Sequence, residues 1–224
     1  VGDIFNWFVQ RLAPGKHVSQ DLAHDALATA AAALAPGESG LLALDWHNGN
    51  RTILVDPLLT GLVVGETLAT TPAELYRALI EATAFGALTI IDRIERFGVT
   101  IQDIVACGGI ALKSPLAMQI YADITGRPIK VSRSPQTCAL GAAIFGSVVG
   151  GAHASVAQAQ IAMCAPPATT YHPRPDAVTI YRRLYTLYAQ LHDAFGGRGA
   201  PVALGGLMKE LIAVRQQARA GRDA

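Results

Sequence analysis

Two adjacent glycines, Gly108 and Gly109, follow a short apolar run and stand before a predicted helix start, with Ser114 as its cap and Pro115 at its first position. The run, residues 104–107, is too short for a helix and predicts a buried strand that stops at Gly108. Glycines at the end of a strand let a flat ligand lie close to the main chain, because no side chain stands in the way. The pattern favours a nucleotide-binding turn, although a strand, a glycine turn and a helix are also the ordinary connection of an α/β fold.

A second pair of polar residues, Asp45 and Arg51, flanks a glycine-containing loop after a predicted strand over residues 41–46. Functional groups of α/β folds gather beyond the strand ends, so both residues could line a cleft. An ion pair between them that orders the loop is the alternative. His47 has no second imidazole or thiolate near it in the sequence, so we predict no metal site there. The other histidines are scattered and are interpreted as surface or packing residues: His17, His24, His153, His172 and His192.

The elements that must position these residues alternate between helices and strands. Thr71, Pro72 and Glu74 predict a helix start with a reciprocal cap, and that helix runs to about Phe97. Within it, Gly86 is small enough for a neighbouring element to approach closely. Further helices are predicted over 4–12, 20–34, 115–125, 137–149, 181–191 and 207–219, and further strands over 104–107 and 129–132, which together make an α/β pattern.

The same patterns predict how some elements pack. The first helix has an apolar face without visible cover, and the helix over 137–149 has the small, alternating bulk of a helix buried against a sheet. Prolines over 166–175 predict an extended connection, and residues 196–199 predict a flexible linker. The basic residues of the last helix are expected on a solvated face: Lys209, Arg215 and Arg219.

Composition limits the classes of function. With 224 residues, 51% of them hydrophobic, the chain can bury a packed core. A formal charge of +1 offers no broad basic surface for nucleic acid, and the apolar run over 26–35 is too short to span a membrane. Three widely spaced cysteines fit neither a zinc site nor a disulfide framework and favour the cytoplasm. The start at Val1 lacks a methionine and looks like a cut inside a larger protein.

Four stretches, taken together and in order, resemble the C-terminal half of the FGGY carbohydrate kinases. The helix that begins at Pro72 is similar to the latter part of the family's second signature, which is far more specific than a glycine pair. Within the family, the opening residues, the loop after Asp45 and the last helix are most similar to members that phosphorylate a ketopentose, with the xylulose and glycerol kinase types as alternatives. The four stretches are residues 42–52, 71–86, 105–111 and 138–145.

The resemblance implies ATP as the nucleotide. Gly108 and Gly109 would face the adenosine, and Lys113 would lie beside the base or ribose. Lys113 departs from the amide-bearing residue that some relatives carry, and an exposed helix start is its alternative role. Gly141 and Ala142 would begin the helix that forms the floor of the adenine pocket, with helix-to-sheet packing as their alternative role.

The resemblance also implies a fold and a set of missing parts. Residues 1–195 would be the C-terminal ribonuclease H-like domain of the actin, hexokinase and Hsp70 superfamily without its first strands, and residues 196–224 a linker and an amphipathic helix. The catalytic base, an aspartate, and the glycine-threonine phosphate loop would lie upstream, with the N-terminal sugar-binding domain of the same parent. Magnesium would be held mainly through phosphates and residues outside this chain. The fragment alone would then be inactive.

Two other classes of function stay open beside the kinase. An assembly module would use the uncovered first helix and the incomplete sheet to recruit a partner, or a second copy in a homo-oligomer. A Rossmann-type dinucleotide domain is disfavoured, because Gly108 and Gly109 are adjacent and no Gly-x-Gly-x-x-Gly follows a strand.

Overall fold

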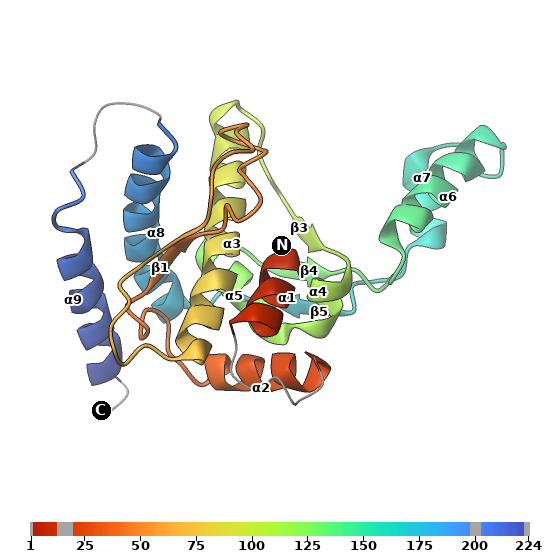
Figure 1. Ribbon diagram of the computed structural model, residues 1–224. Helices are drawn as coiled ribbons and strands as arrows, with labels where there is room; N and C mark the ends of the chain where they lie inside the picture. Colours follow the sequence, from red (N-terminus) through yellow and green to blue (C-terminus); the bar gives the residue numbers. More distant parts are fainter. Residues whose placement is uncertain (1, 13–19, 198–202, 222–224) are drawn as a thin grey trace.

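The computed structural model describes residues 2–12, 20–197 and 203–221. The chain winds around one long central helix, α3, and one helical pair stands apart from the rest (Figure 1). The elements are α1 (Gly2–Arg11), α2 (Gln20–Ala32), β1 (Leu42–Leu44), β2 (Leu62–Val64), α3 (Pro72–Arg96), β3 (Ile104–Ala106), α4 (Gly109–Lys113), α5 (Pro115–Thr125), β4 (Ile129–Val131), α6 (Thr137–Val149), α7 (Val156–Met163), β5 (Thr169–Tyr171), α8 (Pro175–Phe195) and α9 (Leu207–Ala220).

The described strands form two small sheets. β1 pairs antiparallel with β2, and the second sheet has the order β3-β4-β5, with β3 parallel and β5 antiparallel to β4. The sequence patterns predict neither β2 nor β5. The proline-rich stretch over 166–175, expected to be an extended connection, contains β5. Its prolines flank Thr169–Tyr171 and do not interrupt it, so the strand keeps the amides that a ladder needs.

The predicted cap of α3 is confirmed. The Glu74 amide donates to Thr71 Oγ1 at 3.3 Å, and the Thr71 amide donates to Glu74 Oε2 at 2.8 Å. Gly86 also allows the close approach that the sequence predicts. A β-carbon at Gly86 would lie 3.4 Å from both carboxylate oxygens of Asp45, so the end of β1 rests on this point of the helix.

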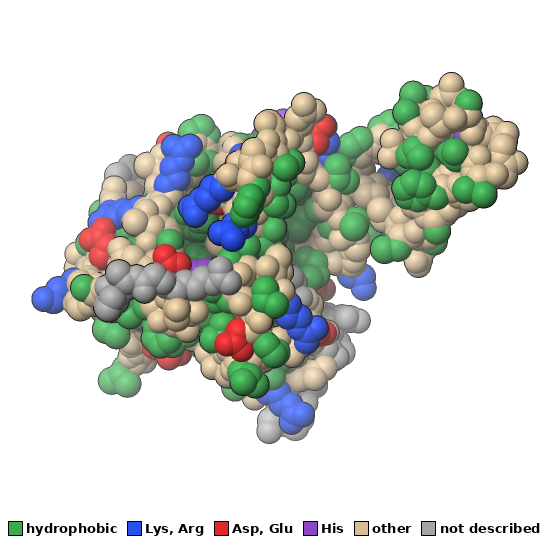
Figure 2. Space-filling view, turned by 90° about the horizontal axis from the view of Figure 1, so that it is seen from above, with side chains coloured by type: hydrophobic (Ala, Val, Ile, Leu, Met, Phe, Trp, Pro, Cys, Tyr) green, Lys and Arg blue, Asp and Glu red, His purple; other side chains and the backbone are tan. Residues whose placement is uncertain are grey.

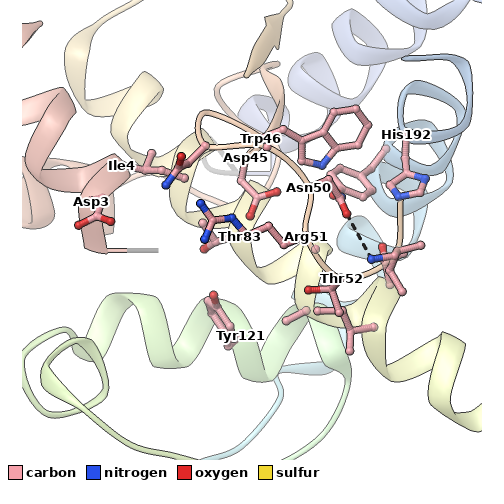
Figure 3. Close-up of a pocket in the computed structure, with 18 residues that line it drawn as sticks. Asp3, Ile4, Asp45, Trp46, Asn50, Arg51, Thr52, Thr83, Tyr121 and His192 are labelled. Atoms are coloured by element: carbon pink, nitrogen blue, oxygen red, sulfur yellow. Dashed lines mark hydrogen bonds between the residues drawn. The ribbon is translucent and has the colours of Figure 1, made fainter. Parts of the chain in front are cut away.

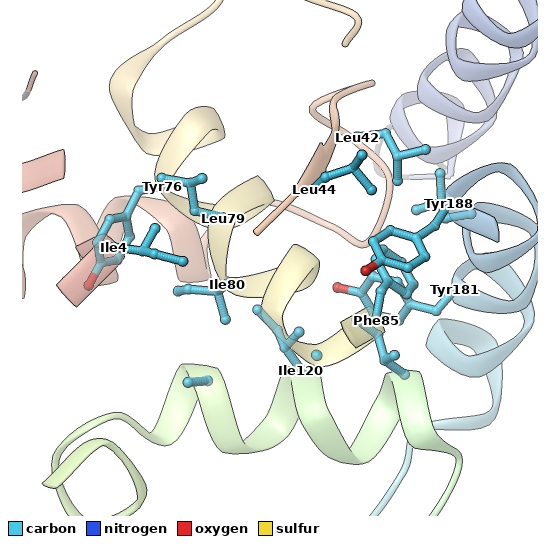
Figure 4. Packing of buried hydrophobic residues seen from close by; sticks show 14 of the residues in the cluster. Ile4, Leu42, Leu44, Tyr76, Leu79, Ile80, Phe85, Ile120, Tyr181 and Tyr188 are labelled. Atoms are coloured by element: carbon cyan, nitrogen blue, oxygen red, sulfur yellow. The ribbon is translucent and has the colours of Figure 1, made fainter. Parts of the chain in front are cut away.

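The apolar core surrounds α3. Helices α2 and α5 and strand β1 pack against it, and α8 packs on α5 and β1. Figure 4 shows side chains of β1, α5 and α8 meeting the middle of α3, where rings of α8 contact Phe85. Burial of these side chains, at about 25 cal/mol per Å² of apolar area, is the main stabilising contribution. The core residues that Figure 4 labels are Ile4, Leu42, Leu44, Tyr76, Leu79, Ile80, Phe85, Ile120, Tyr181 and Tyr188.

A fully buried polar network crosses this core. Arg77 donates to Glu81 at 2.8 Å, to the Ala31 carbonyl at 2.9 Å and to the Tyr181 hydroxyl at 2.8 Å. Tyr181 in turn donates to Glu81 Oε1 at 2.7 Å. The side chains of Arg77 and Glu81 are each 3% exposed, so every lost bond leaves a polar atom without water. The network thereby ties α2, α3 and α8 together.

The expectation that the first helix has an uncovered apolar face is wrong. Ile4, Phe5, Phe8 and Val9 are buried, because α1 packs on α2 and α3. The rings of Phe5 and Phe8 lie 5.7 and 6.0 Å from that of Tyr76. Local sequence shows the face of a helix but not the distant segment that covers it.

The predicted buried strand is an exposed edge strand. Among the described strands β3 pairs with β4 alone, and Val105 is 59% exposed. The glycine turn was also expected to lead directly to the helix start at Ser114. A short extra helix, α4, comes first, and Ser114 then caps α5 by accepting from the Ala117 amide.

The prediction that the helix over 137–149 is buried against a sheet is also wrong. In α6 only Ile144 is buried, and the helix packs against α7 and not on either sheet. The two helices project from the body (Figure 1), and apolar side chains gather on this lobe in the view of Figure 2. Phe145 is 62% exposed and Val149 is 89% exposed. Small residues suit close packing, but they do not specify which surface is packed.

The last helix packs back on the body, which corrects the expected position of one basic residue. Leu207, Leu211 and Val214 are buried, and the stem of Arg215 lies against Gly40. Arg215 is therefore largely buried, whereas Lys209 and Arg219 are exposed as predicted. None of the described helices is both long and apolar enough to cross a membrane. His17 and residues 198–199 of the predicted linker lie outside the described residues.

We predict that Tyr181→Phe lowers the free energy of unfolding by about 1–3 kcal/mol, because Arg77 and Glu81 each lose a partner inside the core. Tyr185→Phe is the matched control. Its hydroxyl bonds to the partly buried Asp92, where water can replace it, so its loss should be below about 1 kcal/mol. Urea unfolding measures both, and equal losses would contradict the assigned role of the network.

Candidate functional site

The predicted nucleotide turn borders a pocket of about 580 Å³, which we call the Gly109 pocket. Its volume lies within the range of about 300–1,000 Å³ that is usual for small-molecule sites. Four helices build it, and apolar and polar side chains alternate around it. The lining residues are Gly2, Phe5 and Asn6 of α1, His24, Asp25 and Ala28 of α2, Tyr76 and Ile80 of α3, Gly109, Ile110 and Lys113 of α4, and Ser114.

The two glycines leave the main chain open, and of the two only Gly109 lines the pocket. A β-carbon at Gly108 or Gly109 would meet no atom within 4 Å. Gly108 has φ +87° and ψ −177°, a conformation that residues with a β-carbon rarely adopt. The sequence therefore needs glycine at 108 for the backbone turn, and it leaves free space above both positions.

A hydrogen-bonded chain joins three walls of the Gly109 pocket. His24 Nδ1 lies 3.3 Å from the Tyr76 hydroxyl, and His24 Nε2 lies 3.1 Å from Asn6 Oδ1. An imidazole protonated at Nε2 satisfies both contacts, because it donates to Asn6 and accepts from Tyr76. Burial, followed by the nearby charge of Asp25, raises the pKa of Tyr76, so the phenol stays protonated and can donate.

The sequence patterns did not find most of the Gly109 pocket. Asn6 lies inside an apolar helical stripe, His24 was interpreted as a surface or packing residue, and Tyr76 lies within the family signature. A polar residue between two aromatic residues is the one local signal that could have pointed to Asn6. These residues meet Gly109 only because α1 and α2 pack on α3. The pocket residues of α2 precede Gly109 by more than 80 positions in the chain.

The remaining predicted adenosine contacts are divided between the Gly109 pocket and α6. Lys113 is exposed and lines the Gly109 pocket with Gly109. Gly141 and Ala142 lie on the projecting α6 and do not line this pocket. The structure thus brings part of the predicted set together and leaves α6 apart.

The predicted cleft residues Asp45 and Arg51 line a second pocket of about 450 Å³, which we call the Asp45 pocket. Figure 3 shows both side chains facing one hollow, with Trp46 and His192 at its far side and Tyr121 approaching from α5. Asp45 directly follows β1, and its carboxylate lies on Gly86 of α3. The close packing of strand on helix therefore fixes the position of this carboxylate.

Burial raises the pKa of Asp45 from 3.8 to about 6. Its own backbone amide opposes the shift, but among the described residues no side chain donates a hydrogen bond to the carboxylate. The raised pKa means that keeping Asp45 ionised at neutral pH destabilises the fold. A carboxylate maintained at such a cost is a candidate functional group.

Two aromatic residues behind Asp45 carry buried polar atoms. Trp46 is 2% exposed and His192 is 6% exposed, and their rings meet edge to face at 5.4 Å. His192 Nε2 has no hydrogen-bond partner in the part of the chain that the structure describes, whereas Trp46 interacts with the hydroxyl of Tyr188. His192, expected from the sequence to be a surface or packing residue, lies in the wall of the Asp45 pocket.

Among the described residues, Asp45 and Arg51 do not form the ion pair that was the alternative interpretation of this loop. The loop is instead held by Asn50, whose Oδ1 accepts from the amides of Ile53 at 3.2 Å and Leu54 at 3.1 Å. Arg51 is exposed at the mouth of the Asp45 pocket. Its guanidinium therefore remains available to a ligand.

We predict that Asp45→Asn stabilises the chain at pH 8. An acid whose folded pKa exceeds its unfolded pKa loses stability as pH rises from about 4 to about 7, so the wild type should lose up to about 3 kcal/mol over this window. The Asp45→Asn variant should not show this loss of stability with rising pH. Asp103→Asn, at an exposed site, is the matched control. Urea unfolding at pH 5 and pH 8 tests the prediction, and a less stable Asp45→Asn at pH 8 would contradict it.

Comparison with known proteins identifies the family. Residues 1–149 match the model of the FGGY family of carbohydrate kinases, C-terminal domain. The chain is 46% identical over 233 residues to the ribulokinase of Geobacillus thermodenitrificans, covering 100% of this chain and 40% of that protein. It is 48% identical over 227 residues to the ribulokinase of Halalkalibacterium halodurans, covering 96% of this chain and 39% of that protein.

A solved structure supports the same relationship. The xylulose kinase from Rhodospirillum rubrum superposes with a TM-score of 0.73 at 29% identity, covering 87% of this chain and 39% of that one. The chain thus spans about two fifths of the length of the proteins that it matches. It belongs to the FGGY family of carbohydrate kinases and corresponds to the C-terminal part of that family's proteins.

Proposed function

We propose that the chain is the adenosine-binding portion of an ATP-dependent sugar kinase of the ribulokinase type, which phosphorylates L-ribulose in arabinose catabolism. Identities of 46% and 48% to two ribulokinases, against 29% to a xylulose kinase, favour this type over the xylulose kinase alternative. A glycerol kinase type is the other alternative within the family. The parent would be a cytoplasmic phosphotransferase with an alcohol group as acceptor.

The Gly109 pocket carries the proposal. Open space at Gly109 suits the flat face of adenine, and the apolar side chains of Phe5 and Ile110 line the same pocket. Gly108 does not line the pocket and remains a predicted contact. Asn6 and Lys113 would meet the polar edge of the base or the ribose hydroxyls. Gly141 and Ala142 remain predicted contacts that this geometry does not support.

Phosphoryl transfer needs groups that the described residues do not bring together. The Gly109 pocket has one carboxylate, Asp25, and no three metal-ligating side chains gather anywhere in the described residues. We therefore assign the magnesium to the ATP phosphates and to residues outside this chain. The catalytic base and the sugar-binding domain are likewise assigned to the rest of the parent. The division at residue 195 also remains a proposal, and the packing of α9 on α8 argues for close association of its two parts.

The assembly module is the weaker alternative. Its first premise, an uncovered α1, fails because that face is buried. Its second premise survives, since β3 has one unpaired edge among the described strands. Homo-oligomers of the parent remain compatible with this edge, but no feature of it selects a partner.

We predict that Gly109→Val weakens ATP binding to the chain by tenfold or more, which corresponds to about 1.4 kcal/mol. A β-carbon at this position meets no atom within 4 Å, so the loss would arise because valine occupies the space of the nucleotide. Gly146→Val, on the exposed α6, also meets no atom and is the matched control. Isothermal titration calorimetry measures the affinities, and unchanged affinity in Gly109→Val would contradict the proposed pocket.

A third variant distinguishes nucleotide binding at the Gly109 pocket from nucleotide binding at α6, where the family resemblance implies a contact. Gly141→Val should leave ATP affinity unchanged, because Gly141 is outside the Gly109 pocket and a β-carbon there meets no atom within 4 Å. Loss of ATP binding in Gly141→Val with normal binding in Gly109→Val would move the nucleotide to α6.

We also predict that the 224-residue chain alone does not turn over ATP and L-ribulose. The positioned base and phosphate-binding groups on which phosphoryl transfer depends are assigned to the remainder of the parent. A coupled assay for ADP, with the full-length parent as positive control, measures this. Phosphorylation of L-ribulose by the chain alone would show that a base lies within it.

A further inference from the structure

A third pocket, of about 550 Å³, lies between β2, the C-terminal end of α8 and α9, and we call it the Arg215 pocket. Helices α8 and α9 stand side by side, away from α1 and α4 (Figure 1). The Arg215 pocket has no lining residue in common with the Gly109 pocket or the Asp45 pocket. A role for it must therefore come from its own groups.

Most of the wall of the Arg215 pocket is aliphatic. Leu62 and Val64 of β2 are half-buried, and Leu211 of α9 is 1% exposed. Met208 and Ile212 of the same helix line the pocket but remain 63% and 52% exposed. A single exposed apolar residue is ordinary, whereas apolar side chains gathered around one hollow are typical of a site for an apolar group.

One charged side chain is largely buried in this wall. The side chain of Arg215 is 16% exposed, and its Nε atom is shielded from solvent without a hydrogen-bond partner in the described residues. Gly40 fixes its stem, because a β-carbon there would lie 2.9 Å from Arg215 Cδ and the glycine has φ +67°. Burial of a guanidinium without hydrogen bonds is unfavourable unless an anion compensates its charge.

The neighbouring carboxylate of Glu74 compensates this charge only in part. Its Oε1 lies 4.0 Å from Arg215 and 3.5 Å from Arg219. Its Oε2 already accepts from the amide of Thr71. Two guanidinium groups therefore share one carboxylate oxygen, which leaves net positive charge beside the pocket. Glu66 also lines the pocket, but its side chain is exposed, where water and salt screen its charge.

We propose that the Arg215 pocket binds a free medium-chain carboxylate, with the chain along the aliphatic wall and the carboxylate at the Arg215 guanidinium. A guanidinium matches a carboxylate in shape and donates charge-assisted hydrogen bonds to it. A phosphate dianion fits less well, because Glu66 opposes its second charge and the walls are largely aliphatic. The inference goes beyond the nucleotide proposal and does not depend on it, because it concerns a separate pocket.

The three methionines of the chain provide the test. Met208 lines the Arg215 pocket, whereas Met118 is a core residue and Met163 lies at the end of α7, and neither of them lines it. Their methyl groups, labelled with ¹³C, are followed by ¹H–¹³C NMR, with Met208→Leu to assign the signals. Millimolar sodium octanoate should shift the Met208 signal saturably and leave the other two in place. An unmoved Met208 signal would overturn the proposal.

Two further probes separate the chain from the carboxylate in the wild-type protein. 1-Octanol has the chain without the charge and should bind about tenfold more weakly than octanoate. Sodium acetate has the charge without the chain and should leave the Met208 signal in place. Equal affinity for octanoate and 1-octanol would overturn the proposal, as would a Met208 shift with phosphatidylglycerol vesicles but not with octanoate.

Matched variants show whether Arg215 is the contact. Arg215→Gln should weaken octanoate binding about tenfold and leave 1-octanol binding unchanged, because only the carboxylate meets the guanidinium. Lys209→Gln removes a charge from the exposed face of the same helix, outside the pocket, and is the control. Met118 and Met163 signals at their wild-type positions show that a variant is folded. Unchanged octanoate affinity in folded Arg215→Gln would overturn the proposal, and if this variant does not fold, the comparison of octanoate with 1-octanol decides.

Discussion

The buried guanidinium of Arg77 is the contact on which the rest of the structure depends. It joins α2 through the Ala31 carbonyl, α3 through Glu81 and α8 through Tyr181, all inside the core. Buried charges are tolerated only when they are paired and fully hydrogen-bonded, so the three helices have one arrangement in which Arg77 is satisfied. This arrangement fixes the rotation of α3 about its own axis.

The rotation of α3 positions both pockets. Residues on one side of the network, Tyr76 and Ile80, form a wall of the Gly109 pocket, and Thr83 and Gly86 form a wall of the Asp45 pocket. At each pocket a glycine without a β-carbon allows the close approach: Gly86 lets Asp45 lie against α3, and Gly109 leaves the main chain open to a ligand. A single central helix thus positions two sites with different chemistry.

Sequence reasoning succeeded where the signal is local. The cap at Thr71, the cap at Ser114 and the bounds of α6 depend on residues a few positions apart, and all three are confirmed. The family was also predictable, because its signature is continuous along the chain. Both halves of the Asp45 pair were found because they follow a strand end. They line one pocket, but without the ion pair that was the alternative.

The failures concern contacts between distant segments. Small residues predicted burial of α6, but nothing local specifies the surface that covers it, and α6 packs with α7 alone. Asn6 and His24 line the Gly109 pocket only because α1 and α2 pack on α3, and the hydrophobic periodicity of a helix does not indicate which distant helix it will contact. The sequence pattern of α9 predicts that Arg215 is solvated. Its stem is buried because α9 packs against the body at Gly40, which the local sequence does not specify.

The most direct measurement is an ADP titration of the ¹⁵N-labelled chain followed by NMR. The central claim is that adenosine lies between α1 and α4. We expect saturable shifts centred on the amides of Asn6, Gly109 and Lys113, with α6 unaffected. Shifts centred on Gly141 and its neighbours, or no shift at saturating ADP, would contradict the claim.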